Sequence, residues 1–190
     1  MLVFAIETSC DETSVCILNK DKLMLSHIIF SQDEHKKFGG VIPELASRSH
    51  LQILQKISKE AFKEAKIDIS EIDVFCSTCG PGLIGGLLVG SIFAKALAIG
   101  QKKPFIPINH LEGHLLSPTY NNNINFPYIS FLLTGGHTQI INVAVSPINF
   151  ATVLPFMSYG QSWFSSDIIN ISDFFEVLES GFLDAVSVYV

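Results

Sequence analysis

Residues 2–29 read LVFAIETSCDETSVCILNKDKLMLSHII, and this opening segment indicates the class of fold. It contains three short apolar runs, residues 2–6, 14–19 and 24–29, which are separated by polar residues. Short apolar runs bounded by polar turns are typical of β-strands, and connections this short join antiparallel neighbours. We therefore expect a three-stranded antiparallel sheet, with a dense polar loop at residues 7–13 between its first two strands.

Helical and extended patterns alternate after this start. Apolar residues recur at helical spacing from Pro43, a residue suited to the first turn of a helix, to about Lys66. The segment 87–99 is apolar on nearly every face, so it predicts a buried helix. Further expected elements are strands at residues 72–76, 105–108, 128–133 and 139–145, and the start of a helix at residues 110–116. This order predicts an α/β lobe with a mixed sheet and flanking helices.

The composition of the chain changes near residue 145. Residues 1–145 carry the alternating pattern, whereas residues 146–190 are rich in serine and large aromatic side chains. Helical periodicity recurs there only at residues 173–183. We therefore expect a first lobe that ends with the strand at 139–145 and a non-matching C-terminal tail, residues 146–190, that is helical or irregular.

Charge and cysteine content limit the classes of function. The net charge is -6, all 12 Lys and Arg lie between residues 20 and 103, and residues 104–190 contain six acidic residues and no Lys or Arg. Phosphate neutralisation supplies most of the affinity for nucleic acid, so binding of tRNA by this chain alone is not expected. The sequence contains no recognisable targeting segment, and its four cysteines are expected to stay reduced. Prolines interrupt the uncharged residues 113–166 too often for a membrane-spanning helix. The sequence therefore predicts a soluble cytoplasmic protein without a membrane span.

A histidine pair is the first candidate site. His110 and His114 are four residues apart, so on a helix they share a face and are able to bind one metal ion. The alternative is two histidines that are hydrogen-bonded in a packed turn. A zinc peptidase needs its general base directly after the first histidine, but Leu111 stands there and the carboxylate is at Glu112, so the metallopeptidase interpretation is disfavoured.

A glycine-rich segment and two polar turns are the candidate phosphate-binding features. Residues 80–85, GPGLIG, match the dinucleotide-binding pattern, but the expected acidic ribose ligand is missing and further glycines continue along the helix. We therefore favour close helix packing for these glycines. The polar turns at residues 7–13 and 134–138 present backbone N–H groups suited to phosphate oxygens, and Asp11 or Glu12 is placed to position a metal or water. A pair of such turns in one lobe is the arrangement of actin-like ATPase folds.

Five strings together, in order and spacing, resemble one family. They are IETSCDET (residues 6–13), FGGVIPELASRSH (38–50), GPGLIGGLLVG (80–90), NHLEGH (109–114) and LTGGHTQ (133–139). The segment of about residues 1–144 is similar to the tRNA N6-adenosine threonylcarbamoyltransferases, formerly called O-sialoglycoprotein endopeptidases or glycoproteases.

The resemblance implies an actin-like ATPase fold, related to ribonuclease H, with a second lobe that residues 146–190 do not match. It implies transfer of a threonylcarbamoyl group from threonylcarbamoyl-AMP to N6 of adenosine 37 in tRNAs that read ANN codons. It also implies one divalent metal, iron(II) or zinc, and an adenylate substrate. The implied residues are His110 and His114 as metal ligands, Asp11 and Glu12 as catalytic acids near the phosphate, and Leu132, Leu133, Thr134, Gly135 and Gly136 as the stretch that binds the adenylate.

Two interpretations of the chain's role follow. The first is an acyltransferase that engages tRNA only with companion proteins of the pathway and associates, as a heteromer or homodimer, through its N-terminal lobe. The second is a non-catalytic lobe of the same pathway that binds and scaffolds a partner. Two imidazoles leave a first-row metal ion short of its usual four ligands, so weak metal binding is predicted for this chain alone.

Overall fold

The computed structural model describes residues 1–32, 35, 38–133, 138–143 and 186–189. Clustering of contacts divides the chain into two compact units, Met1–Gly113 and His114–Val190. The expected tail helix at residues 173–183 lies outside the described residues.

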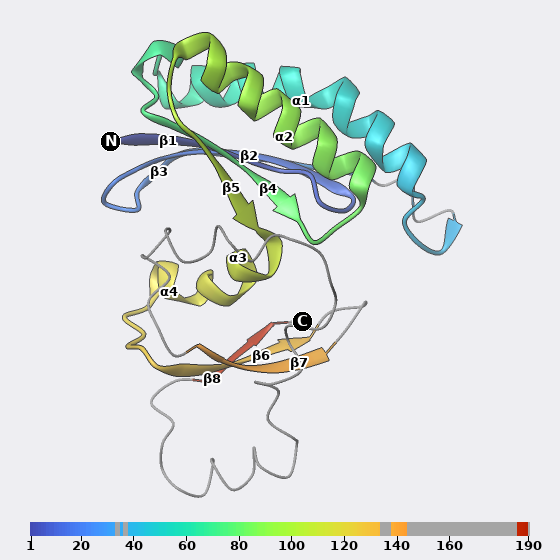
Figure 1. The fold of residues 1–190 in the computed structure, drawn as a ribbon, viewed down its shortest axis with the longest axis vertical. Coiled ribbons are helices and arrows are strands. Elements are labelled where there is room, and N and C mark those ends of the chain that lie inside the picture. Colours follow the sequence, from blue (N-terminus) through green and yellow to red (C-terminus); the bar gives the residue numbers. More distant parts are fainter. Residues whose placement is uncertain (33–34, 36–37, 134–137, 144–185, 190) are drawn as a thin grey trace, which may run out of the picture. The chain divides into compact units, whose positions relative to one another are not determined.

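The first unit is built on a five-stranded mixed sheet (Figure 1). Its strands are β1 (Leu2–Glu7), β2 (Glu12–Asn19), β3 (Met24–Ser31), β4 (Val74–Gly80) and β5 (Phe105–Asn109), in the order β3-β2-β1-β4-β5. The pairs β1–β2 and β2–β3 are antiparallel, as the opening segment predicts. Strands β1, β4 and β5 are parallel to one another, so their carboxyl ends meet at one edge of the sheet.

Two long helices, α1 (Pro43–Ala65) and α2 (Ile84–Gln101), cover one face of this sheet (Figure 1). Pro43 occupies the first turn of α1, where its missing N–H has no hydrogen bond to lose. Both helices end at a lysine in the left-handed conformation, Lys66 and Lys102, whose backbone N–H groups bond to carbonyls of the last turn. A short 3-10 helix, η2 (Ile69–Glu71), begins with a capping box formed by Asp68 and Glu71.

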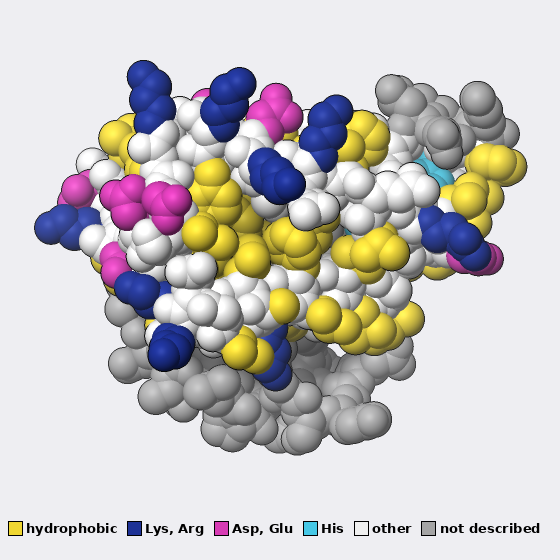
Figure 2. Space-filling model, turned by 90° about the horizontal axis from the view of Figure 1, so that it is seen from above, with side chains coloured by type: hydrophobic (Ala, Val, Ile, Leu, Met, Phe, Trp, Pro, Cys, Tyr) yellow, Lys and Arg dark blue, Asp and Glu magenta, His cyan; other side chains and the backbone are white. Residues whose placement is uncertain are grey.

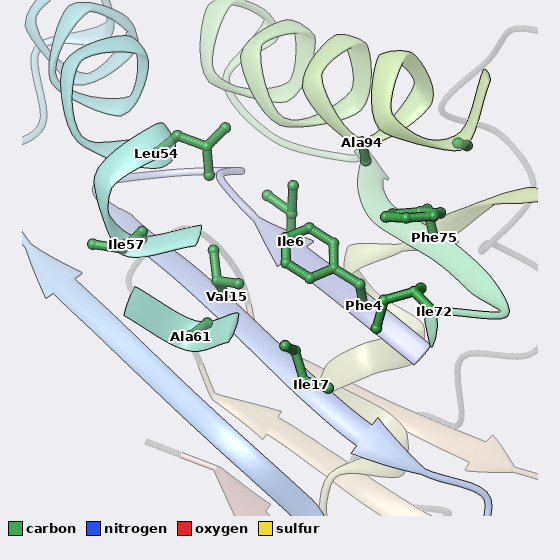
Figure 3. Close-up of a cluster of buried hydrophobic side chains, with 11 residues drawn as sticks. Phe4, Ile6, Val15, Ile17, Leu54, Ile57, Ala61, Ile72, Phe75 and Ala94 are labelled. Atoms are coloured by element: carbon green, nitrogen blue, oxygen red, sulfur yellow. The ribbon is translucent and has the colours of Figure 1, made fainter. Parts of the chain in front are cut away.

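The core of the first unit lies between the sheet and the two helices (Figure 3). Phe4 stacks on Phe62 of α1 with ring centroids 5.1 Å apart, and it also contacts Phe75 of β4. Because side chains alternate along a strand, every second residue of β1 and β2 points into this layer. The buried apolar cluster comprises Phe4, Ile6, Val15, Ile17, Leu54, Ile57, Ala61, Ile72, Phe75, Ala94 and Ala98.

Glycines let α2 approach the end of β1 closely. A Cβ on Gly86 would lie less than 3.0 Å from the carbonyl oxygen of Thr8, and a Cβ on Gly90 would collide with the Thr8 hydroxyl. The hydroxyl of Thr8 donates a 2.9 Å hydrogen bond to the carbonyl of Gly86. The packing role predicted for the glycine-rich segment is therefore confirmed.

The prediction that α2 is buried all round is wrong. Its small residues Gly86, Gly90, Ala94 and Ala98 are buried, whereas Ile84, Leu88, Ile92 and Ile99 are exposed on the opposite side. Within the described residues α2 is also the one helix whose length and apolar composition would suit a membrane span. Its small-residue face contacts β4 and β1, which is the packing of a helix on a sheet.

The second unit contains a three-stranded sheet of order β7-β6-β8. Strands β6 (Tyr128–Leu133) and β7 (Thr138–Val143) pair antiparallel, which confirms the predicted hairpin pairing. Strand β8 (Val186–Tyr189) lies parallel to β6, so the expectation of a helical or irregular tail is wrong for these four residues. Helix α3 (His110–Leu116) follows β5 directly, and the division between the units falls within it; α4 (Pro118–Asn121) comes next.

Candidate functional site

The carboxyl edge of the parallel strands brings polar groups of the first unit together. Glu7 ends β1, Thr78 lies near the end of β4, and His110 follows the last residue of β5. Nδ1 of His110 lies 3.1 Å from the hydroxyl oxygen of Ser9 and 3.5 Å from Oε2 of Glu7. Ligands of open α/β sheets bind outside the carboxyl ends of the strands, so this cluster stands where a site is expected.

Glu7 is the electrostatic centre of this cluster. Its Oε1 accepts a 2.5 Å hydrogen bond from the backbone N–H of Ser9, and its Oε2 accepts one from the hydroxyl of Thr78. Burial alone would raise the pKa of this carboxyl, but hydrogen bonds from His110, Ser9 and Thr78 outweigh it and lower the pKa from 4.5 to about 2. Glu7 is therefore a carboxylate across the physiological pH range.

Helix α3 presents the two histidines. The side chain of Asn109 accepts hydrogen bonds from the backbone N–H groups of Leu111 (2.9 Å) and Glu112 (3.4 Å), so it caps the helix and sets its start. His110 and His114 both lie within α3, four residues apart, as the sequence predicts.

The donor set around α3 fits a metal ion in part. Two imidazoles one helical turn apart are able to coordinate the same metal ion. Metal-binding histidines commonly have a carboxylate beside the ring nitrogen that does not bind the metal, and Glu7 lies beside Nδ1 of His110. Among the described residues, no group of three or more His, Cys, Asp and Glu gathers as a metal site. The described residues thus offer two candidate ligands, His110 and His114, and their metal-binding role stays a prediction.

The two predicted catalytic acids are adjacent: Asp11 ends the loop between β1 and β2, and Glu12 is the first residue of β2. Asp11 is half-buried, and it contributes with burial to raising the pKa of the neighbouring Cys10 thiol to about 11. Glu12 is exposed at the start of β2, where its Oε1 accepts a 2.9 Å hydrogen bond from Ser31 of β3. The catalytic role of both residues stays a prediction.

The predicted adenylate-binding stretch begins in β6. Leu132 is buried in the second unit and Leu133 is the last residue of the strand. Thr134, Gly135 and Gly136 lie outside the described residues, so the role of this stretch also stays a prediction.

His50 is a site residue that sequence reasoning missed. It is fully buried on α1, its Nε2 donates to the carbonyl of Cys10 (3.0 Å), and its Nδ1 lies 2.8 Å from the hydroxyl of Thr13. Burial lowers its pKa from 6.5, which favours the neutral ring. His50 thereby anchors the loop that carries Asp11. In the sequence, only its place in the family string FGGVIPELASRSH indicated that His50 belongs to the site.

A five-stranded sheet of this order, with two helices on one face and a polar loop between its first strands, defines the actin-like, ribonuclease H-like class of α/β lobes. The solved structure of YeaZ from Pseudomonas aeruginosa is similar in fold, with a TM-score of 0.52 and 18% sequence identity over 77% of this chain and 63% of that chain. Residues 23–150 match the family model described as tRNA N6-adenosine threonylcarbamoyltransferase, and the chain belongs to this family.

Curated relatives agree with this assignment. A protein of Orientia tsutsugamushi strain Boryong named tRNA N6-adenosine threonylcarbamoyltransferase is 48% identical over 144 residues, and one of the same name from Rickettsia canadensis is 49% identical over 142 residues. These alignments cover 75% and 74% of this chain. The chain spans 42% of the length of either relative.

Proposed function

We propose that this chain provides the N-terminal part of a cytoplasmic tRNA-modifying acyltransferase. The substrates are threonylcarbamoyl-AMP and N6 of adenosine 37 in tRNAs that read ANN codons. The observation that carries the proposal is the contact of Glu7 and Ser9 with His110 at the carboxyl edge of the sheet, in a chain of this family.

Each group has a role in this proposal. His110 and His114 hold one divalent metal, iron(II) or zinc, and Lewis-acid polarisation of a phosphate or carbonyl oxygen is the chemistry that such an ion supplies when bound. Asp11 and Glu12 act at the phosphate end of the adenylate. Moving an activated acyl group to an amine requires positioning and charge stabilisation more than a covalent intermediate.

The adenylate is held by the end of β6 and the turn that follows it. The stretch comprises Leu132, Leu133 and residues 134–136, and we assign the backbone N–H groups of residues 134–136 as donors to the negatively charged oxygens of the substrate. Residues 134–136 carry no ionisable side chain, so their donors to an anion are the backbone N–H groups and the hydroxyl of Thr134.

The test is a chimera. Residues 1–144 of this chain replace the matching segment of the Orientia relative, and threonylcarbamoyladenosine is quantified in tRNA after incubation with the companion proteins, threonine, bicarbonate and ATP. The chimera should modify tRNA, and the double change His110→Ala with His114→Ala should abolish modification. His27→Ala, at an exposed histidine of β3, is the matched control and should leave it intact. A folded chimera that binds the companion proteins but leaves tRNA unmodified would contradict the proposal.

Exposed apolar side chains on the outer face of helices α1 and α2 indicate a surface for binding a partner. Leu51 of α1 and Ile84, Leu88, Ile92 and Ile99 of α2 are all about half or more exposed, and Figure 2 shows hydrophobic side chains gathered among lysines on this side of the molecule. Contiguous exposed apolar surface marks interaction sites in soluble proteins. We propose this outer face, defined by these five residues, as the surface that binds a companion protein of the pathway.

Charge placed on this face tests the proposal. Ile92→Glu should weaken the complex with the companion protein at least 10-fold, because a carboxylate would have to be buried without a partner. Lys20→Glu, in the turn after β2, changes the charge by more but lies off the helical face, so it should bind as the unmodified chain does. Equal binding by both variants would exclude the outer face.

A further inference from the structure

Two side chains contact Nδ1 of the His110 ring. Its Nδ1 faces the hydroxyl oxygen of Ser9 at 3.1 Å and Oε2 of Glu7 at 3.5 Å. The hydroxyl of Ser9 is able to donate or accept, so this contact alone does not define the proton on the ring. The carboxylate resolves the ambiguity, because an ionised carboxylate only accepts hydrogen bonds.

The orientation of Glu7 is itself determined by its neighbours. The backbone N–H of Ser9 donates to Oε1, and the hydroxyl of Thr78 donates to Oε2, so one donor reaches each carboxylate oxygen. Strand β1 pairs with β4 in parallel register, which brings Glu7 and Thr78 to the same end of the sheet. These bonds fix Oε2 beside the imidazole.

We propose that Glu7 is a positioning residue that holds His110 as the tautomer with hydrogen on Nδ1 and the lone pair on Nε2. This inference rests on the proposed metal-binding role of His110. A metal-binding histidine donates its other ring N–H to a carboxylate, carbonyl or water, which sets its tautomer and its orientation. In the described structure that acceptor is Glu7, to which the family resemblance assigns no role.

The substitution Glu7→Gln should invert the tautomer. The Ser9 N–H requires an oxygen at the Oε1 position, so the amide group of the glutamine takes the Oε2 position. The amide group then donates an N–H to Nδ1 of His110. Because Nδ1 must accept this hydrogen bond with its lone pair, the ring hydrogen moves to Nε2. Ser9→Ala leaves the carboxylate in place, so Nδ1 should keep its hydrogen.

The tautomer is read from the 15N chemical shifts of the two imidazole nitrogens in the metal-free 190-residue chain, in mildly alkaline buffer where neutral rings prevail. His110→Gln assigns the resonances. The expected result is a protonated Nδ1 in the unmodified chain and in Ser9→Ala, and a protonated Nε2 in Glu7→Gln. A protonated Nε2 in the unmodified chain overturns the proposal whether or not Glu7→Gln folds.

A zinc titration gives the second measurement. Glu112→Gln is the matched control, because it removes the same charge from α3 two residues away from His110. Zinc affinity, measured by competition with a chromophoric chelator, should fall about 10-fold to 100-fold in Glu7→Gln and stay within 2-fold (about the precision of the assay) in Glu112→Gln. Equal losses in the two variants would overturn the positioning role. Neither measurement depends on tRNA modification, so failure of the transfer assay is distinguishable from failure of this inference.

Discussion

Gly86→Ala should destabilise the first unit although alanine is the better helix former. The added Cβ would lie less than 3.0 Å from the backbone oxygen of Thr8 and 3.1 Å from two ring atoms of His50. Neither neighbour is the free end of a flexible side chain, because Thr8 and His50 are both buried and hydrogen-bonded. Helix α2 must therefore move away from the end of β1.

The size of the effect follows from three contributions. Overpacking of a close contact costs about 1–3 kcal/mol, and loss of the buried Thr8 to Gly86 hydrogen bond costs about 1 kcal/mol. The gain in helix propensity offsets about 1 kcal/mol of this. We expect a net loss of about 1–3 kcal/mol.

The assay is urea unfolding followed by circular dichroism. With a slope of about 2 kcal/mol per M, a loss of 2 kcal/mol lowers the midpoint by about 1 M. Gly100→Ala is the matched control, because it makes the same change in the same helix where a Cβ meets nothing within 4 Å, and it should raise stability by up to about 1 kcal/mol. Two variants that shift in the same direction would refute the reasoning from close packing.

His50→Leu should lower the free energy of unfolding by about 2–4 kcal/mol, since the Cys10 carbonyl and the buried Thr13 hydroxyl lose their partner. His27→Leu on the exposed side of β3 should change it by less than about 0.5 kcal/mol. Because burial lowers the pKa of His50 below 6.5, the unfolded chain binds the proton more readily. The contribution of His50 to the free energy of unfolding is thus complete above pH 6.5 and declines on acidification. The negative charges of Glu7 and Asp11 reduce the lowering of its pKa, and His35 increases it. Urea titrations should therefore show a weaker pH dependence of stability in His50→Leu. Iodoacetamide should label Cys10 slowly at neutral pH, because its pKa is raised to about 11, and should leave the buried Cys76 unlabelled until the chain unfolds, as peptide mass spectrometry would report.

Most of the first unit was predictable because its signals are local. The three opening strands, the helix that begins at Pro43 and the strand at residues 105–108 each follow from an apolar run or stripe bounded by turn residues. The exposure of the outer side of α2 was not predictable from periodicity. A helix that is apolar all round gives no sign of which side meets the sheet, and here Gly86 and Gly90 decide it.

The site shows the same limit at the level of single residues. Asp11 and Glu12 draw attention because they are adjacent acids in a polar loop, yet the carboxylate that reaches His110 is Glu7 at the end of β1. Glu7 and His110 are 103 positions apart in the sequence. The parallel pairing of β1 with β4 and of β4 with β5 brings them to one edge of the sheet.

The packing of α2 and the geometry at His110 are physically linked through the loop after β1. The N–H of Leu83 donates a 2.8 Å hydrogen bond to the carbonyl of Ser9, and a Cβ on Gly82 would lie 2.7 Å from the same oxygen. The start of the helix therefore holds the backbone of Ser9, while the Ser9 side chain faces Nδ1 of His110. A shift of α2 by a few tenths of an ångström would lengthen that contact. Gly82, Gly86 and Gly90 thus affect the candidate site as well as the core, because they let the helix approach closely enough to fix the position of Ser9.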